Sequence, residues 1–474
     1  MLLVKIVRGM KKAFLSVALL ALMMIPSRNA DAQMMSPRVN RDSLNNLTAA
    51  DYSDMKAKLG IRELRPGKDG YSTDPAIGAN YDEFIANPYL NYPDPLVTFG
   101  GRTVKNKKMW YGVRRPELVQ VFEDEFYGHL PENLPGVTWK VVEESHVLMG
   151  DIPCISRQLA GVVDNSSCPT INVTIQAEIM WPENARESIP VIVEFGYMMG
   201  GFAMPAGQGP KRKPWKEQVV ERGWAACTIV PTSYQADGGH GLRNGIIGLC
   251  NNGDFRDPDD WGVLRAWAWG ASKLVDYFET QAQFDATKVA VEGNSRYGKT
   301  ALVATAFDTR IASAFVSSSG KGGAAPWRRY CGETVENIAA SSEYHWMAGN
   351  FLKYAAEPLN AGDMPVDQHE LLALCAPRPI LISGGLPSAD KWQDIMGMFM
   401  CASLASPVYE LLGAGGLKYG YGESSEGMRA DIFPGVNVGL MGGRLAFRMH
   451  DGGHEPGPNW PYFLDFFDRF VVTK

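Results

Sequence analysis

The sequence predicts a three-layer α/β fold, in which a mostly parallel central sheet begins with antiparallel strands and is covered by helices on both faces. Two observations predict it. Continuous apolar runs, typical of strands buried on both faces, alternate with stretches of helical periodicity. Before them lie two segments in which apolar and polar residues alternate, as in half-buried antiparallel strands. Strands that alternate with helices in this way form a parallel sheet with helices on each side.

The elements are expected in a definite order along the chain. The two alternating segments are Val137–Val142 and Asn172–Trp181. The expected buried strands are Pro190–Phe195, Ala225–Val230, Lys288–Glu292, Ala314–Val316, Pro379–Ser383 and Arg444–Arg448. The expected helices are Trp215–Arg222, Asp259–Glu279, Tyr297–Phe307 and Trp460–Phe470.

Length and composition suggest one large domain with an extension before it. The chain has 474 residues, of which 45% are hydrophobic, enough to bury a substantial core. Residues 33–130 are rich in Pro, Asn, Asp and Tyr and show weak periodicity, so we expect an extension that wraps the main domain. No chemistry can be read from this extension. Residues 131–474 are expected to form the main domain.

Residues 1–32 are predicted to be a cleaved signal peptide. A basic stretch, Lys5–Lys12, is followed by an apolar run, Ala13–Ile25, and by the small-residue site Ala30-Asp31-Ala32. The apolar run is too short to span a bilayer comfortably, although an uncleaved signal anchor is the alternative. We therefore expect a secreted or periplasmic protein that is not attached to a membrane. Cleavage moves the formal charge from -6 to -10, which argues against nucleic acid as a partner.

The seven cysteines suggest at most partial disulfide pairing. Export permits disulfides, but an odd number leaves at least one thiol unpaired. Cys154 and Cys168 flank an expected hairpin and could pair. Cys227 and Cys375 lie in apolar, strand-like segments and are expected to be buried free thiols. The sequence has no C-x-x-C pair, so we expect no zinc site of that kind.

Ser295 is the candidate nucleophile. The stretch Gly293-Asn294-Ser295-Arg296-Tyr297-Gly298 joins an expected strand directly to an expected helix. A serine on such a tight turn projects its hydroxyl above the sheet edge, which is the nucleophile elbow of α/β-hydrolases. The helix N-terminus also directs backbone N–H groups at a developing oxyanion. The second glycine comes one residue later than in the usual G-x-S-x-G pattern, and a glycine-flanked serine between strand and helix can also be a simple loop.

The residues around the elbow resemble the glucuronoyl esterases, carbohydrate esterase family 15. Gly293-x-Ser295-Arg296-x-Gly298-Lys299 with Ala301-Leu302 is similar to the family signature. Further similar stretches, in the same order as in the family, are Asp259–Gly270 with Asp276-Tyr277, His345-Trp346 with Asn350-Phe351, and Asp367–Pro379. The resemblance covers about residues 135–470.

The resemblance implies an α/β-hydrolase with a Ser–His–acid triad and neither a metal nor a cofactor. Members of the family cleave esters between alcohols and the carboxylate of (4-O-methyl-)glucuronic acid on xylan, including esters with lignin alcohols. The implied partner is therefore glucuronoxylan or a lignin–carbohydrate ester.

His454 is the candidate base. Triad residues follow one another as Ser, acid and His in this fold, so the base should come from a loop after the last strand. Only His450 and His454 lie between the last expected strand and the last helix. His454 stands in a Gly-rich loop that suits an exposed imidazole, and the family has its catalytic His in this loop. His450 ends the strand and is expected to support the loop; His345 and His369 are expected to be structural.

The acid is where this sequence departs from its family. Many members carry a Glu in a Gln-Glu-Ser-Gly motif after the elbow, but this chain has Ser318 at that position, within Ser317–Gly320. A serine cannot stabilise an imidazolium by charge. The second placement in the family is an acid after the next strand, which implies Asp390. A solvated loop Asp is the alternative, and Asp394 and Glu343 are lesser candidates.

The remaining candidate residues concern the oxyanion and the sugar. Arg296 follows the nucleophile, so its N–H is placed to donate to an oxyanion, and in the family its guanidinium helps. Lys299 resembles a contact to sugar hydroxyls, Trp392 an aromatic contact to the glucuronate, and Glu333 an acceptor for ring hydroxyls. Lys299 and Glu333 could equally be solvated surface charges.

Three functions remain open at this point. The first is glucuronoyl ester hydrolysis through an acyl-enzyme on Ser295. The second is an esterase for acetyl groups on xylan or for other sugar esters. The third is an inactive homologue that only binds glycans, which the missing Glu at position 318 favours.

Overall fold

The computed structural model describes residues 41–186, 188–197, 212–417 and 433–473. The chain divides into two compact units, Met1–Asn46 and Leu47–Lys474. The expected signal peptide, residues 1–32, lies outside the described residues. In the part that is described, no helix is long and apolar enough to cross a membrane.

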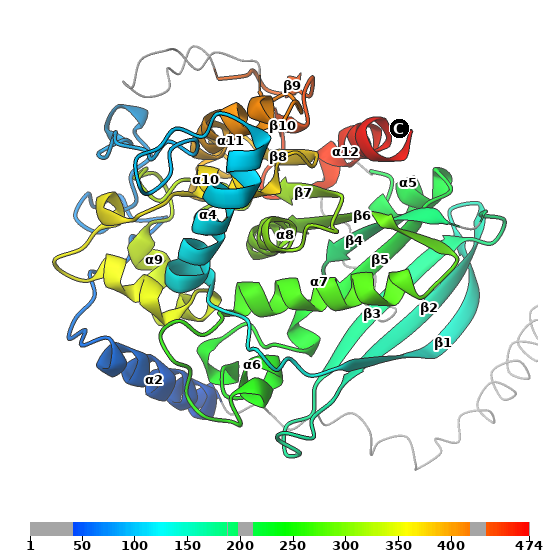
Figure 1. The fold of residues 1–474 in the computed structure, drawn as a ribbon, viewed down its shortest axis with the longest axis horizontal. Coiled ribbons are helices and arrows are strands. Elements are labelled where there is room, and N and C mark those ends of the chain that lie inside the picture. The colour runs from blue at the N-terminus through cyan, green and yellow to red at the C-terminus, as the bar shows by residue number, and fades with distance from the viewer. Residues whose placement is uncertain (1–40, 187, 198–211, 418–432, 474) are drawn as a thin grey trace, which may run out of the picture. The chain divides into compact units, whose positions relative to one another are not determined.

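A ten-stranded sheet forms the centre of the larger unit (Figure 1). Its spatial order is β1-β2-β3-β5-β4-β6-β7-β8-β10-β9. The strands are β1 (Val137–Met149), β2 (Ile152–Val163), β3 (Thr174–Pro182), β4 (Ile189–Phe195), β5 (Ala225–Val230), β6 (Phe284–Asn294), β7 (Ser313–Ser317), β8 (Ile380–Gly384), β9 (Gly439–Leu440) and β10 (Leu445–Met449).

The strand pairing confirms the predicted fold class. Strands β1, β2, β3 and β5 pair antiparallel, whereas β5, β4, β6, β7, β8 and β10 pair parallel. The short β9 adds antiparallel to β10. Strand β2, which joins β1 through a turn at Gly150 (φ +59°), was not among the predicted strands. Its buried positions include Ser156 and Gly161, so apolar and polar residues do not alternate regularly along it.

Helices cover both faces of the sheet, as expected (Figure 1). One face packs against α7, α8 and α11, and the other against α5 and α12, since alternate residues of the parallel strands belong to two separate apolar clusters. The α-helices are α2 (Arg41–Lys58), α3 (Lys107–Met109), α4 (Arg115–Phe122), α5 (Trp215–Glu221), α6 (Gly245–Cys250), α7 (Val263–Glu279), α8 (Arg296–Phe307), α9 (Val335–Ala339), α10 (Gln368–Cys375), α11 (Ile395–Leu411) and α12 (Trp460–Phe467).

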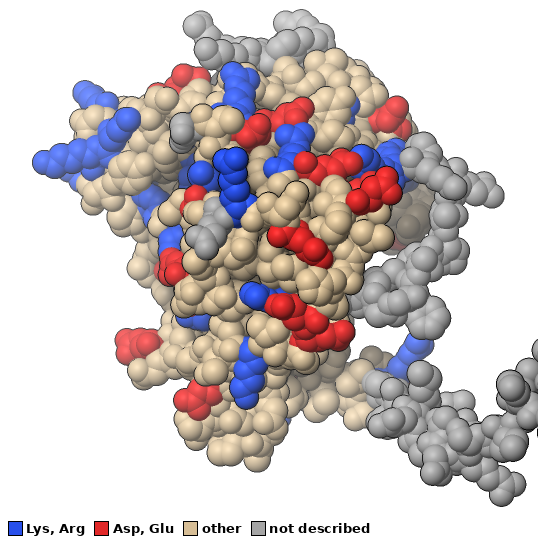
Figure 2. Space-filling view, turned by 90° about the vertical axis from the view of Figure 1, so that its right-hand side faces the viewer, with Lys and Arg blue, Asp and Glu red and all other residues tan. Residues whose placement is uncertain are grey.

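Part of the N-terminal region is anchored to the main domain by polar contacts. The Arg65 guanidinium donates to Glu336 Oε1 at 3.0 Å and to the Tyr354 carbonyl at 2.6 Å. The buried Arg114 guanidinium donates to Glu370 Oε1 at 2.6 Å, on α10. On the face shown in Figure 2, basic and acidic side chains are interspersed and form no continuous basic area.

The cysteines correct one prediction. All seven lie in the described part and are free thiols there, so Cys154 and Cys168 do not pair. Cys154 lies near the start of β2 and Cys168 beyond its end, separated by a strand that rises about 3.3 Å per residue, whereas a disulfide needs Cα atoms within about 7 Å. Cys227 and Cys375 are fully buried free thiols, as predicted, although Cys375 ends helix α10 rather than lying in a strand.

Candidate active site

Ser295 stands at the turn between β6 and α8 in a strained backbone conformation. Its φ is +61° and its ψ is −128°, a combination that a residue with a side chain rarely adopts. A Cβ added at Gly293 would lie 2.1 Å from the Tyr297 carbonyl oxygen. A Cβ added at Gly298 would lie 2.6 Å from the Ser317 carbonyl oxygen on β7. The late second glycine is therefore the one that this turn requires, because Gly298 is where the helix meets the neighbouring strand.

His454 and Asp390 form a hydrogen-bonded pair beside this turn. His454 lies in the loop between β10 and α12, and its Nδ1 is 2.8 Å from Asp390 Oδ1. Asp390 is 4% exposed, whereas the His454 side chain is 40% exposed. Within the described residues no hydrogen bond uses the other ring nitrogen, Nε2, which leaves it available for proton exchange. Ser295 and His454 line the same hollow.

Ser318, which stands where the resemblance predicts a Glu, contacts Asp390. Its hydroxyl donates to Asp390 Oδ2 at 2.5 Å, and the Gly385 backbone N–H donates to the same oxygen at 3.3 Å. One carboxylate oxygen of Asp390 is thus held by β7 and β8 while the other faces His454. Asp390 lies in the segment after β8, and the Ser318 hydroxyl helps to fix the orientation of its carboxylate.

The other acids and histidines considered from the sequence have different partners. Asp394 is buried and pairs with Arg329 at 2.9 Å. His450 is buried, and its Nε2 and Nδ1 bind backbone groups of the His454 loop. His369 Nε2 binds the Pro93 carbonyl at 2.7 Å.

Asp237 holds the Arg296 side chain and was not singled out from the sequence. Its Oδ2 pairs with the Arg296 guanidinium, while its Oδ1 accepts from His345 at 3.0 Å and from Trp346 Nε1 at 2.8 Å. Burial raises the pKa of Asp237, but the hydrogen bonds from His345 and Trp346 and the charge of Arg296 outweigh it and hold the pKa below its usual range. The carboxylate therefore stays charged. The guanidinium also lies over the Trp346 ring, 5.4 Å from its centre.

Lys299 and Glu333 form a buried ion pair instead of solvated surface charges. Their side chains are 3% and 4% exposed, and Lys299 Nζ is 3.0 Å from Glu333 Oε2. Lys299 also donates to the Ser319 carbonyl at 2.9 Å. Nearby, burial and the charge of Glu333 raise the pKa of Glu343 to about 8.

Trp392 lies in the wall of a hollow of about 450 Å³, which we call the Trp392 hollow. Asp390 and His454 line it as well, together with Tyr71 and Tyr81 from the N-terminal region. The Trp392 carbonyl accepts from the Glu333 backbone N–H at 3.1 Å, which ties this hollow to the buried ion pair. Nothing in the composition of residues 33–130 pointed to this contribution.

His454 also lines a second hollow. We call it the Glu292 hollow; its volume is about 720 Å³, and its wall includes Glu292, Asn294, Ser295, Arg296 and His454.

Among the described residues, no group of three or more His, Cys, Asp or Glu side chains is arranged to hold a metal ion.

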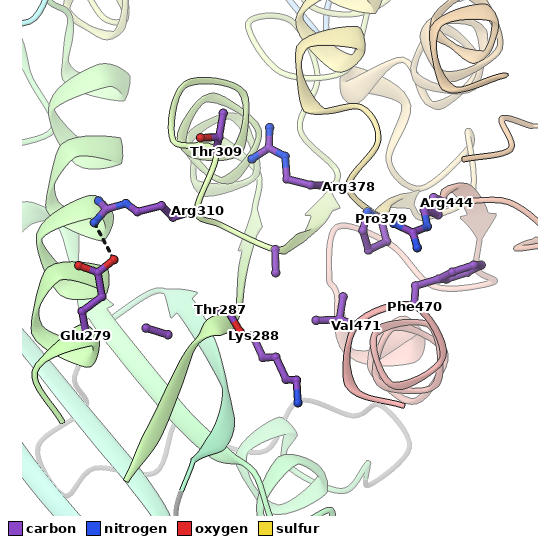
Figure 3. A pocket seen from close by; sticks show the side chains of 12 residues that line it. Glu279, Thr287, Lys288, Thr309, Arg310, Arg378, Pro379, Arg444, Phe470 and Val471 are labelled. Carbon is purple, nitrogen blue, oxygen red and sulfur yellow. Dashed lines mark hydrogen bonds and ion pairs between the residues drawn. The ribbon is translucent and has the colours of Figure 1, made fainter. Parts of the chain in front are cut away.

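The opposite, amino end of the parallel strands carries a further hollow of about 520 Å³ (Figure 3). Figure 3 shows basic side chains around it, among them Arg310 and Arg378, from the segments that precede strands β7 and β8. Arg310 pairs with Glu279 at 3.2 Å, and Arg378 donates to the Asp308 carbonyl at 2.8 Å. Ligands of open α/β sheets bind at the carboxyl ends of the strands, where Ser295 lies and this hollow does not.

Comparison with known proteins gives the same family by sequence and by structure. The family model described as glucuronyl esterase, fungi, matches residues 254–413, which include the elbow, the ion pair and Asp390. The chain is 32% identical over 426 residues to carbohydrate esterase MZ0003 from an unknown prokaryotic organism, covering 83% of this chain and 93% of that protein. It is 27% identical over 351 residues to a 4-O-methyl-glucuronoyl methylesterase from Podospora anserina, covering 72% and 64%.

Among solved structures, the chain is similar to a CE15 glucuronoyl esterase from Teredinibacter turnerae. The TM-score is 0.81 and the identity is 40%, over 89% of this chain and 99% of that one.

Proposed function

Because the chain belongs to carbohydrate esterase family 15, whose members are carboxylic ester hydrolases, we propose that it hydrolyses esters of (4-O-methyl-)glucuronic acid on xylan, including lignin–carbohydrate esters. The observation that carries the proposal is the His454–Asp390 hydrogen bond of 2.8 Å beside the elbow serine. It supplies the acid that the sequence lacks at Ser318. An oriented imidazole is what separates an active serine esterase from an inactive homologue.

The proposed reaction proceeds through an acyl-enzyme on Ser295. His454 takes the proton of the Ser295 hydroxyl while the Ser295 oxygen bonds to the ester carbonyl carbon. The tetrahedral intermediate collapses, the bond from that carbon to the alcohol oxygen breaks, and His454 returns the proton to the leaving alcohol. Water, activated by His454 in the same way, then releases the glucuronate and regenerates the serine. Asp390 holds the ring tautomer and stabilises the imidazolium.

Arg296 is proposed to stabilise the oxyanion. Its backbone N–H begins helix α8, so the positive end of the helix dipole faces the carbonyl oxygen. Its guanidinium, anchored by Asp237, adds a fixed positive charge in the same hollow. A preorganised donor of this kind lowers the barrier by about 3 kcal/mol.

Lys299, Glu333 and Trp392 are proposed to bind the sugar. The buried ion pair presents polar atoms that need no rearrangement to meet hydroxyl groups, and Trp392 offers an aromatic face beside them. Residues 33–130 are proposed to be an extension of a catalytic domain formed by residues 131–474. Tyr71 and Tyr81 give it a part in the Trp392 hollow.

The signal-peptide pattern of residues 1–32 supports export to the periplasm or the cell exterior, which is where xylan and lignin esters occur. Detecting the mature chain, beginning near Gln33, in the periplasmic or culture fraction tests this location.

The function is tested by comparing two substrates. Wild-type protein should hydrolyse benzyl glucuronate at least about 100 times more efficiently, in kcat/KM, than an acetylated xyloside. Ser295→Ala should abolish both activities. Preference for the acetylated xyloside would instead make the chain an acetyl esterase, and no turnover of either substrate would favour a glycan-binding homologue.

A further inference from the structure

A row of acidic side chains crosses the sheet next to the elbow. Glu178 on β3, Thr228 on β5, Glu194 on β4 and Glu292 on β6 are consecutive register partners. They therefore point to one face of the sheet. Two residues earlier on the strands, this face carries the buried apolar side chains Ile192, Ala226 and Ala290, which pack under α5 and α12. The change from apolar to acidic occurs at the end of the sheet where Ser295 lies.

Among the described residues Glu178 forms an ion pair, whereas Glu194 and Glu292 form none, although Glu194 lies within the electrostatic influence of Lys216. The Lys216 ammonium bonds to Glu178. Glu194 accepts a hydrogen bond from the Thr228 hydroxyl at 3.2 Å. Glu292 is 1% exposed, and its Oε1 has no hydrogen-bond partner among the described residues.

Burial explains how two carboxyl groups can face each other here. An isolated buried carboxylate is costly, so the group keeps its proton instead. Burial raises the pKa of Glu194 to about 7, and burial together with the charge of Glu194 raises the pKa of Glu292 well above its usual range. When it holds its proton, Glu292 can donate a hydrogen bond as well as accept one.

A second buried polar atom on the same strand also lacks a partner. Asn294 Oδ1 has none among the described residues, and Asn294 follows Glu292 by two positions, on the same face of β6. Both side chains line the Glu292 hollow, and so does the aromatic ring of Trp215. Buried polar atoms in native proteins are nearly always hydrogen-bonded. Two residues with an unpartnered oxygen in the wall of one hollow therefore indicate a ligand with hydroxyl groups.

His454 gives the hollow its place in the reaction. His454 lines both hollows, and the Trp392 hollow contains one of the proposed sugar contacts, Trp392. His454 must protonate the leaving oxygen, so the alcohol leaves beside its ring, and the sugar is proposed to contact Trp392, which lines the other hollow. The Glu292 hollow remains for the alcohol.

We propose that the Glu292 hollow is the subsite for the leaving alcohol and that Glu292 and Asn294 select alcohols that carry a second hydroxyl group. The inference rests on the proposed function, because it concerns the alcohol half of the same ester. Glu292 and Asn294 bind this hydroxyl, and Trp215 contacts the carbon skeleton of the alcohol.

Two esters of glucuronic acid test the inference, one with 3-hydroxypropyl and one with n-butyl as the alcohol. They differ only by a terminal hydroxyl in place of a methyl group. Wild-type protein should favour the 3-hydroxypropyl ester by about tenfold in kcat/KM, the size expected for one or two hydrogen bonds to groups otherwise left unpaired. Glu292→Leu should reduce this ratio to about one, and Glu292→Gln, which keeps a donor and an acceptor, should retain most of it.

Glu279→Gln is the control, since it removes a carboxylate that has a cation partner, Arg310, and that lies outside the Glu292 hollow, and the ratio should stay near ten. A wild-type ratio near one would overturn the inference and would mean that only water binds Glu292 and Asn294. This comparison needs no variant, so it holds even if Glu292→Leu fails to fold. Turnover of the n-butyl ester without preference contradicts the inference alone, whereas no turnover of either ester contradicts the proposed function.

Discussion

Two groups of buried charged side chains near His454 differ in their partners. Lys299 and Glu333 form an ion pair, and Asp390 accepts from three donors. Glu194 and Glu292 are register partners on neighbouring strands, and neither forms an ion pair within the described residues. We propose that the first group, near Trp392, serves the sugar and that the second serves the alcohol, so the comparison concerns a charge-paired subsite and one that lacks ion pairs.

Replacing Asp390 should have the largest effect. Asp390→Asn leaves the geometry of the His454 loop but removes the charge that supports the imidazolium, so kcat should fall about 10³–10⁴-fold. Ser318→Ala removes only the hydroxyl that orients Asp390, and kcat should fall about tenfold or less. Steady-state kinetics on benzyl glucuronate measure both. An equal loss in the two variants would mean that Ser318 carries a role that we assign to Asp390.

Breaking the buried ion pair should come next. Lys299→Met leaves Glu333 buried without a partner, so the free energy of unfolding should fall by about 3–5 kcal/mol, and KM should rise. The double variant Lys299→Met with Glu333→Gln removes both charges and should recover much of the stability but not the KM. Chemical denaturation gives the first quantity. If the double variant also recovered KM, the pair would not bind the sugar.

The unmatched carboxyl groups should make stability fall as pH rises. The unfolded chain releases the Glu194 proton near pH 4.5, whereas the folded protein holds it until about pH 7. The folded state therefore binds more protons in this window, and its stability decreases as the pH increases through it. In Glu194→Gln, the decrease in the free energy of unfolding between pH 4.5 and pH 7 should be smaller by roughly 2 kcal/mol. Chemical denaturation at pH 4.5 and at pH 7 measures the free energy of unfolding, with Glu279→Gln at the far end of the sheet as the control. If Glu194→Gln lost as much stability between these pH values as the wild type, the raised pKa of Glu194 would be contradicted.

Releasing Arg296 should have the smallest effect. Asp237→Asn removes the charge that anchors the guanidinium, and kcat should fall about tenfold with little change in KM, because the oxyanion forms only in the transition state. Asp276→Asn, which affects an ion pair with Arg310 at the amino end of the sheet, is the control and should leave kcat unchanged. A change confined to KM would show that Asp237 acts on substrate binding instead.

The fold could be predicted from the sequence because its signals are local. Apolar runs and helical spacing gave the parallel strands and the helices that flank Ser295, and the Gly293–Gly298 pattern gave the elbow. The family resemblance supplied His454 and Asp390. Strand β2 was missed because apolar and polar residues do not alternate regularly along it. The suggested Cys154–Cys168 disulfide was wrong because the number of residues between two cysteines does not give the distance between them in the fold.

The rest of the site depends on contacts between distant segments. Asp237 lies in a loop after β5 and meets Arg296 only because β5, β4 and β6 are neighbours in the sheet. Tyr71 and Tyr81 reach the Trp392 hollow from a region with no periodic signal. Glu194 and Glu292 are each a single acidic residue within an apolar strand, and only the register brings them together.

The most direct test of the account is to map the residue that reacts with a fluorophosphonate probe. The account predicts a single adduct on Ser295, no adduct in Ser295→Ala, and labelling slowed by orders of magnitude in Asp390→Asn, because the imidazole then lacks its orienting charge. An adduct on another residue, or labelling of Asp390→Asn at the wild-type rate, would contradict it.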